Sequence, residues 1–291
     1  MQDSSRALSI LYLSVFLLAL NGLFSKIIPL DAVSVTQLRS VLAVIALSLF
    51  ALLLNRDIRL RSLKQYLGVY LIGVIMGLHW ISFFHSMQVS TVAIGMLSLF
   101  SYPVITVMLE PLFSKQRIAV ADIFAAMLVL LGVLVMVSDE LHGFDSAAVQ
   151  GVIWGVLSAL LFSLRNLLQK YFYPEVPSDR LILHQVIAIS FMLLLFMDFR
   201  AVGQLQPRDW GLLVLLGAVS TAAAHSLLSY SLKHLPAKSI AMISCLQPLF
   251  AALFAWLLLN EIPSLWVILG GLMIIAVALY ESLKKAQKQK T

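Results

Sequence analysis

Long apolar runs separated by short polar segments cover almost the whole chain. A helix needs about 20 apolar residues to cross the hydrocarbon core of a bilayer. Ten such runs lie at roughly 7–28, 33–54, 66–87, 91–113, 119–137, 151–172, 180–199, 210–232, 238–259 and 263–282. Barrel strands would instead alternate polar and apolar residues over about ten positions. The pattern therefore predicts an all-α integral membrane protein with ten transmembrane helices and no inserted soluble domain.

The composition supports a membrane location. Hydrophobic residues make up 61% of the chain and charged residues 12%, whereas a soluble domain has about 45–50% apolar and about 25% charged residues. Such a chain cannot cover its surface with polar groups in water, so we expect it in the plasma membrane, or in the inner membrane of a bacterium. A single cysteine, Cys245, excludes an internal disulfide framework and a multi-cysteine metal site. We expect neither a metal nor another cofactor.

The lysines and arginines fall almost entirely on one side of the predicted spans. With the N-terminus in the cytoplasm, fifteen of them lie in inner loops or the tail, and only Arg200 and Arg208 lie in outer loops. The fifteen are Arg6, Arg56, Arg59, Arg61, Lys64, Lys115, Arg117, Lys170, Arg180, Lys233, Lys238, Lys284, Lys285, Lys288 and Lys290. Because cytoplasmic loops carry the excess of positive charge, both termini are predicted to be cytoplasmic.

The net charge of +6 is therefore a topology signal, and no nucleic-acid partner is expected. The segment 283–291 is predicted to be a basic cytoplasmic tail that lies near anionic lipid. The lipid bilayer itself is thus the first partner that the sequence indicates.

The chain contains a weak internal repeat. Ten spans divide into five and five, and an odd number in each half turns the second half upside down in the membrane. A shift of 145 residues places Pro103 on Pro248, both near the midplane of their spans. A proline kinks a helix and frees a carbonyl, which in a bilayer must find a partner or line a wet cavity. Interrupted helices at matching positions of inverted repeats indicate the central site of a transporter, although both prolines could also serve packing alone.

The second half also carries a recognisable family pattern. The stretch CLQPLFAALFAWLLLNE is followed by IPSLWVILGGLMIIAVAL, with Glu261 thirteen residues after Pro248 and a glycine pair at 270–271. In these features the chain resembles the EamA-type transporters of the drug/metabolite transporter superfamily. The resemblance covers two tandem repeats, at about 7–137 and 151–282.

The first repeat departs from the family pattern, because Gln116 occupies the place of the acid, and Ala125 and Ala126 replace the glycine pair. The resemblance implies a ten-helix carrier with both termini in the cytoplasm and a central cavity between two inverted five-helix halves. It also implies metabolite transport, often the export of amino acids or related small solutes.

Ionisable residues within predicted spans are costly and are candidate functional groups. Arg39 and Arg165 each lie about four residues from a midplane, and either could hold an anionic group of the substrate, since arginine presents a planar fork of donors. Snorkelling or internal pairing is the alternative for both. Lys26, near the outer end of the first span, is a gate or ion-pair candidate, although snorkelling to the interface is the role that its position favours. Asn21 is assigned to helix packing.

Further polar and aromatic residues lie near the midplane and are candidate cavity residues. Trp80 could stack on a flat or apolar solute, and His225 could titrate near neutral pH, which leaves proton coupling open. Hydrogen bonding between helices is the alternative role for the polar members. Besides the two arginines, the predicted cavity residues are His79, Trp80, Ser98, Tyr102, His225, Tyr230, Ser244 and Gln247.

Glu110 lies near the cytoplasmic end of the span 91–113, within reach of Lys115 and Arg117. We expect it to form an inner gate or an ion pair there, and a proton-coupling carboxylate is the alternative. Pro111 falls in the last turn of the same span, where a kink does little harm.

Together these features predict a secondary transporter that exports a small polar metabolite, such as an amino acid, by alternating access. It would act as a monomer or a homodimer, and the absence of a P-loop disfavours direct use of ATP. One alternative is an importer of a nucleoside- or vitamin-like solute. Another is an intramembrane enzyme acting on a lipid-borne substrate through His79, His184, His225 and Glu110, although the H-E-x-x-H and G-x-S-x-G motifs are absent.

Overall fold

The computed structural model describes residues 2–90, 92–114, 118–136, 146–259 and 265–288, and within these ranges every regular element is a helix. Five helical segments are long and apolar enough to cross a membrane, and shorter apolar helices accompany them. The predicted all-α membrane fold is thus confirmed. Each of the ten predicted spans coincides with one helix or with consecutive helices, while the number that cross a bilayer stays a prediction.

In the first half the described helices are α1 (Gln2–Leu18), α2 (Leu20–Ile27), α3 (Ala32–Leu53), α4 (Leu63–Val89), α5 (Val92–Leu99), α6 (Tyr102–Ser114) and α7 (Val120–Met136). In the second half they are α8 (Ser146–Phe172), α9 (Ser178–Leu193), α10 (Phe199–Val202), α11 (Pro207–Leu215), the π-helical segment η2 (Leu216–Ala223), α12 (Ala224–His234), α13 (Ala237–Ser244), α14 (Gln247–Leu259) and α15 (Leu265–Lys288). Several of the predicted spans are therefore built from two or three shorter pieces.

Two of these interruptions coincide with the paired prolines. The chain leaves helical geometry between α5 and α6 and again between α13 and α14, and Pro103 and Pro248 are each the second residue of the helix that follows. Proline is tolerated in a first turn because its missing N–H would have no partner within the helix there. The prolines thus begin the second piece of two discontinuous spans at matching positions of the two halves.

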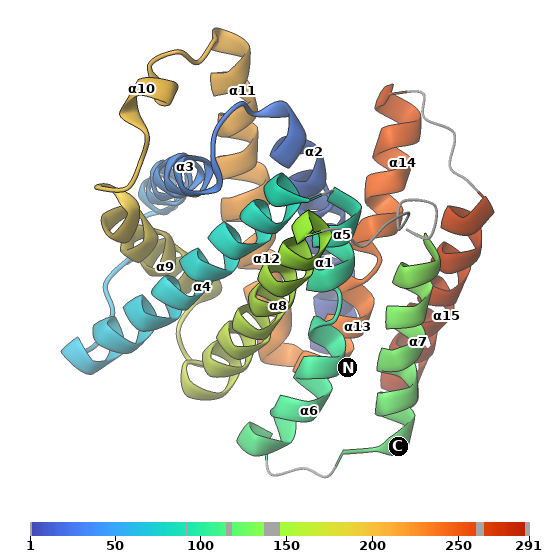
Figure 1. The fold of residues 1–291 in the computed structure, drawn as a ribbon. Helices are drawn as coiled ribbons and strands as arrows, with labels where there is room; N and C mark the ends of the chain where they lie inside the picture. The colour runs from blue at the N-terminus through green and yellow to red at the C-terminus, as the bar shows by residue number, and fades with distance from the viewer. Residues whose placement is uncertain (1, 91, 115–117, 137–145, 260–264, 289–291) are drawn as a thin grey trace.

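The two halves are joined by hydrogen bonds that recur with the spacing of the repeat to within one residue. Ser86 Oγ of α4 donates to the carbonyl of Gly151 in α8 at 2.6 Å, and Ser231 Oγ of α12 donates to the carbonyl of Ala7 in α1 at 3.0 Å. A second pair consists of Ser158 Oγ to His79 O, 3.1 Å, and Ser14 Oγ to Ala224 O, 2.8 Å. Each half therefore packs one of its helices on the first long helix of the other, α4 on α8 and α12 on α1, as Figure 1 shows for α4 and α8.

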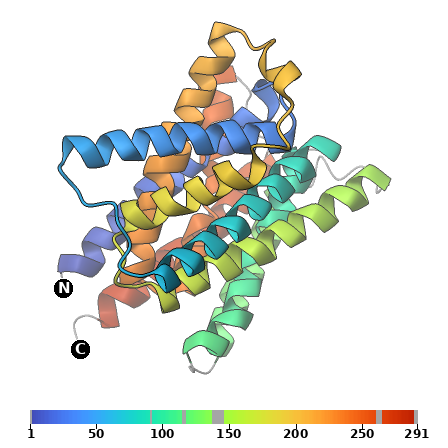
Figure 2. The ribbon, with the colours of Figure 1, turned by 90° about the vertical axis from the view of Figure 1, so that its left-hand side faces the viewer.

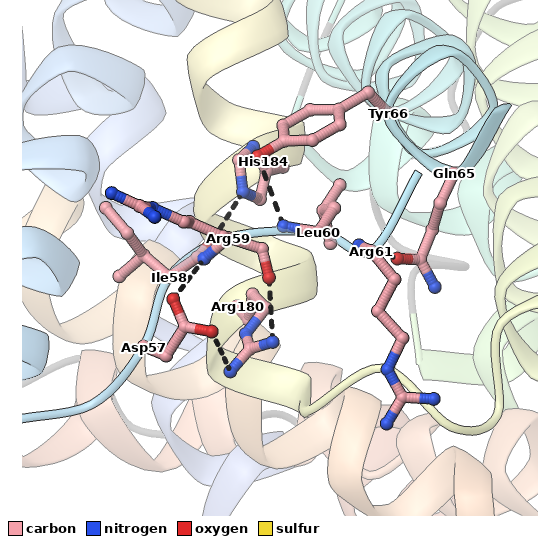
Figure 3. Close-up of polar contacts among 9 residues, drawn as sticks. All are labelled: Asp57, Ile58, Arg59, Leu60, Arg61, Gln65, Tyr66, Arg180 and His184. Atoms are coloured by element: carbon pink, nitrogen blue, oxygen red, sulfur yellow. Dashed lines mark hydrogen bonds and ion pairs between the residues drawn. The ribbon is translucent and has the colours of Figure 1, made fainter. Parts of the chain in front are cut away.

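The start of α1 and the end of α15 lie at the same end of the bundle (Figure 2). The loop after α3 is fixed to the start of α9 at that end, where Arg56 forms a 2.7 Å ion pair with Asp179. In Figure 3 the ring of His184 lies against this loop, with Nε2 2.8 Å from the carbonyl of Ile58, and Arg180 donates to the carbonyl of Arg59 at 2.8 Å. His184 is therefore engaged in holding a loop at the end of the bundle.

α7 and α15, the last helices of the two repeats, lie side by side at one edge of the bundle (Figure 1). Their backbones approach closely, because a Cβ atom added at Gly132 would lie 3.0 Å from the carbonyl oxygen of Gly270. Large apolar side chains such as Phe124 and Leu272 are exposed on the outer faces of the pair. An apolar outer face suits a helix pair that borders lipid.

We predict that the α4–α9 contact is sensitive to one added methyl group. A Cβ at Gly73 would lie 2.7 Å from the backbone carbonyl oxygen of Gln185 and 2.9 Å from Cβ of Ala188. Since backbone atoms cannot move aside cheaply, Gly73→Ala is expected to destabilise the protein by about 1–3 kcal/mol. The apparent melting temperature of the purified protein in detergent measures this effect.

Gly211→Ala is the matched control, because nothing lies within 4 Å of a Cβ at this helical position. Its melting temperature should stay unchanged or rise slightly, since alanine also restricts the unfolded chain. Equal melting temperatures for Gly73→Ala and the wild type would contradict the close approach of α4 and α9.

Candidate functional site

A small cavity lies between the two halves and includes residues from both interrupted spans. Its volume is about 30 Å³, and a single water needs about 10–15 Å³. In this conformation the cavity is too small for a metabolite. It is lined by Leu18, Asn21, Arg39, His79, Trp80, Phe83, Leu99, Phe100, Tyr102, Phe162, His225 and Gln247.

Arg39 of α3 is the charged group of this cavity and is only 1% exposed. Its Nε donates to Thr221 Oγ1 at 2.9 Å, and its Nη2 donates to Asn21 Oδ1 at 3.2 Å. Its guanidinium carbon lies 4.2 Å from the centroid of the Trp80 ring and 5.5 Å from that of Phe84. Stacking on aromatic rings stabilises a desolvated cation. These partners are all neutral, and the two hydrogen bonds of Arg39 come from its Nε and Nη2.

The partner Thr221 is presented by the π-helical segment η2. Its hydroxyl donates to the carbonyl of Leu216 at 2.7 Å while it accepts the hydrogen bond from Arg39. The same segment packs directly on α3, because a Cβ at Gly217 would lie 3.1 Å from the carbonyl oxygen of Arg39. π-Helical segments are rare and occur frequently at functional sites. Here the wider turn places a hydroxyl beside the buried guanidinium.

Two histidines of the cavity lining differ in their hydrogen bonding. Nδ1 of His79 lies 2.7 Å from Ser158 Oγ, and its ring stacks on Phe162 at 4.6 Å. His225 of α12 is 2% exposed, lies 5.2 Å from the Trp80 ring, and has no hydrogen-bond partner for either ring nitrogen within the described part of the chain. A buried polar group left unpaired costs about 1–3 kcal/mol. His225 is therefore a point where a bound solute can add a hydrogen bond.

Arg165 of α8 is fully buried, yet it is not part of the cavity lining. Its Nε and Nη2 donate to Gln185 Oε1 at 3.1 and 2.7 Å, and its Nη1 donates to Asn166 Oδ1 at 2.9 Å. All three guanidinium nitrogens are thus engaged, and Arg165 joins α8 to α9. The sequence treats Arg39 and Arg165 as equivalent candidates, and the structure separates them.

The structure brings together six of the ten predicted cavity residues. These six are Arg39, His79, Trp80, Tyr102, His225 and Gln247. The other four, Ser98, Arg165, Tyr230 and Ser244, lie outside the lining: Ser98 Oγ donates to the carbonyl of Ile94 in its own helix, Tyr230 packs its ring 4.7 Å from that of His234, and Ser244 is buried in α13. The side chain of Lys26 lies outside the described residues.

Sequence reasoning missed most of the apolar wall and assigned Asn21 to helix packing. Asn21 lines the cavity and binds Arg39, while its amide nitrogen donates to the carbonyl of Leu18 at 2.9 Å. Phe83, Phe100 and Phe162 complete the wall. A phenylalanine in a span carries no sequence signal that separates a cavity position from a lipid-facing one, whereas the amide of Asn21 could have been grouped with Arg39.

Glu110 of α6 is 6% exposed, and its carboxylate accepts three hydrogen bonds. Its Oε1 accepts from the backbone N–H of Ala237 at 3.0 Å and from the Tyr171 hydroxyl at 2.9 Å, and its Oε2 accepts from the backbone N–H of Lys238 at 2.9 Å. The carboxylate therefore caps the first turn of α13, where the helix dipole favours a negative charge. The expected partners at 115–117 lie outside the described residues.

A second contact joins α13 to the first repeat beside Glu110. Lys238 forms an ion pair with Asp122 of α7, which is buried. The space between Glu110, Asp122 and Lys238 has a volume of about 10 Å³, which is at most one water. α6 and α7 of the first repeat are thus tied to α13 of the second.

Comparison with known proteins adds independent findings. A model of the EamA-like transporter family matches residues 5–138 and again residues 149–280. An uncharacterized transporter of Archaeoglobus fulgidus is 27% identical over 91% of this chain and 92% of its own length. The pseudopaline exporter CntI of Pseudomonas aeruginosa is 26% identical over 80% of this chain and 81% of its own length. A crystal structure aligns over 99% of both chains with a TM-score of 0.80 at 17% identity, which shows a shared fold.

The two family matches cover both halves of the chain, and the relatives named above are transporters. The expected resemblance, with one EamA repeat in each half, is therefore confirmed. The chain belongs to the EamA-like transporter family and is a multi-pass membrane transporter of the drug/metabolite type.

Proposed function

We propose that this protein exports a small polar metabolite with a carboxylate group, such as an amino acid or a related solute, by alternating access of its two repeats. The observation that carries the proposal is the buried guanidinium of Arg39, which lines the central cavity with neutral partners only. The name of one relative, a pseudopaline exporter, supports export as the direction.

The substrate's carboxylate would supply the counter-charge that Arg39 lacks. An ion held in a low-dielectric interior costs several kcal/mol unless it is paired. None of the residues that line the cavity is an acid. Nη1 of Arg39 takes part in neither of the hydrogen bonds to Thr221 and Asn21. Because the guanidinium is stacked on Trp80, Nη1 is an oriented donor for an incoming carboxylate.

Alternating access would use the two interrupted spans as hinges. We place the end that carries both termini in the cytoplasm, on the strength of the fifteen lysines and arginines assigned to it. The contacts of Glu110 and Asp122 then close the cytoplasmic side in this conformation. Opening requires the first turn of α13 to leave the Glu110 carboxylate, which makes Glu110 the inner gate. Proton coupling stays a prediction that the flux measurements below address, and the oligomeric state stays a prediction as well.

The alternative of an intramembrane enzyme gains no support from the geometry. Its candidate groups occupy separate places, since His184 bonds a loop carbonyl and Glu110 caps α13, whereas His79 and His225 line the cavity. No observation in the described part of the chain favours import of a nucleoside-like solute over export.

Within the proposed function, the first prediction concerns Arg39. Arg39→Lys keeps the positive charge but loses the planar fork and the hydrogen bonds that orient it. We expect flux of labelled amino and carboxylic acids in proteoliposomes, with and without a pH gradient, to fall at least about tenfold, the factor that about 1.4 kcal/mol represents. Arg56→Lys is the matched control, because Arg56 is half-exposed and pairs with Asp179 away from the cavity. Full flux in Arg39→Lys for every solute moved by the wild type would sink the proposal.

The second prediction concerns the gate. Glu110→Gln keeps the shape of the side chain but removes the charge that caps α13. We therefore expect the closed state to become less stable relative to the open state. Cys245 is the single cysteine of the chain and is buried at the end of α13. Its labelling by a membrane-impermeant maleimide in inside-out vesicles should become several-fold faster.

Glu175→Gln provides the control for this labelling, because Glu175 is exposed and accepts a hydrogen bond from Gln65. It should label at the wild-type rate. Unchanged labelling of Cys245 in Glu110→Gln would show that the carboxylate does not hold the cytoplasmic side closed.

A further inference from the structure

We infer that the transported solute is an organic acid with a net negative charge, held by Arg39 at its carboxylate and by the ring nitrogens of His225 at a second oxygen-bearing group. This inference rests on the proposed function, because it concerns the same cavity and narrows its solute class. It departs from the expectation of an amino acid, whose ammonium group would also have to be accommodated.

The charge of the lining argues against a zwitterion. The lining contains Arg39 and two histidines, and no acid is among its residues. The ammonium group of an amino acid would lose its water shell there without gaining a carboxylate, a cost of several kcal/mol. Of the aromatic rings in the lining, Trp80 is the type that binds cations best, and it already holds the Arg39 guanidinium at 4.2 Å.

A second buried cation strengthens the preference of the cavity for an anionic solute. Arg165 is fully buried and donates only to the neutral side chains of Gln185 and Asn166. It does not line the cavity, yet the field of an uncompensated charge in a low-dielectric bundle extends beyond its contacts. The membrane-embedded centre therefore carries two guanidinium groups and, among the described residues, no anion that pairs with either of them.

His225 supplies the second point of recognition. Both of its ring nitrogens are buried and unpaired among the described residues, and its ring lies beside the same Trp80 that stacks on Arg39. A neutral imidazole has one donor and one acceptor nitrogen. A carboxylate beside a hydroxyl group satisfies both, since the carboxylate accepts and the hydroxyl donates. A small hydroxy-dicarboxylate thus matches the lining at both ends.

The test uses four-carbon compounds of nearly equal size that differ in charge. The purified full-length protein in detergent is titrated with malate, succinate, butyrate, aspartate and asparagine, and binding is followed by calorimetry and by the shift in melting temperature. We expect malate to bind most tightly, succinate next, and asparagine at least about tenfold more weakly than malate. This ranking is measured on the wild type, so it does not depend on any variant folding.

His225→Phe then separates the second contact from the first. Phenylalanine keeps a ring beside Trp80 and removes both nitrogens, so malate is expected to lose about tenfold in affinity, while butyrate, which has only one carboxylate, keeps its affinity. His85→Phe is the matched control, because His85 lies on α4 against Trp154 and is not part of the lining. It should leave both affinities unchanged.

Each other outcome overturns the inference in a recognisable way. Tighter binding of asparagine than of malate, or no binding of any acid in the series, would show that the solute is not an organic anion. An equal loss for malate and butyrate in His225→Phe would remove His225 as a contact. The proposed function fails separately, through full flux in Arg39→Lys, so a carrier of neutral amino acids that depends on Arg39 would refute only the inference.

Discussion

In a bilayer every backbone polar group must find its partner within the protein, and this constraint decides where the helices of this chain can be interrupted. The interruptions beside Pro103 and Pro248 lie inside the bundle, where both prolines are buried. Polar groups there are satisfied across helices: the carbonyl of Tyr102 accepts from Ser163, and the Tyr102 hydroxyl donates to the carbonyl of Ala241 at 2.8 Å. A site made of broken helices is therefore possible only where the two repeats meet.

The repeats meet in a reciprocal way, but the site between them is not symmetric. The spans that correspond under the repeat differ in two places. α8 and α4 are continuous, whereas their counterparts are interrupted at Ala19 and widened into the π-helical segment η2. Those two irregularities supply Asn21 and Thr221, the two hydrogen-bond partners of Arg39. The departures from symmetry thus coincide with the group on which the proposed binding of solute depends, as expected where local rules are broken at functional sites.

The Glu110 carboxylate and the cavity around Arg39 differ in how completely their polar groups are hydrogen-bonded. The Glu110 carboxylate is satisfied by two backbone N–H groups and a hydroxyl, so it stabilises one packing of α6 on α13. Among the described residues neither ring nitrogen of His225 has a hydrogen-bond partner, and Arg39 has only neutral partners, so a solute bound as proposed would add hydrogen bonds there. A carrier needs both properties: an end that closes firmly and a centre whose bonding is incomplete until the solute is bound.

The sequence by itself determined the all-α membrane class, the two repeats, the family and the presence of arginine and histidine within the spans, because these follow from local composition and spacing. Only the tertiary structure decided that Arg39 lines the cavity, whereas the guanidinium of Arg165 is hydrogen-bonded to Gln185 and Asn166. It also decided that Asn21 and three phenylalanines line the same cavity, and that Glu110 caps α13. The physical reason is that helices apolar on every side carry no periodic signal for their rotation about the axis. The partners concerned lie up to 182 residues apart, as for Arg39 and Thr221, so packing between distant helices alone sets which side chains meet.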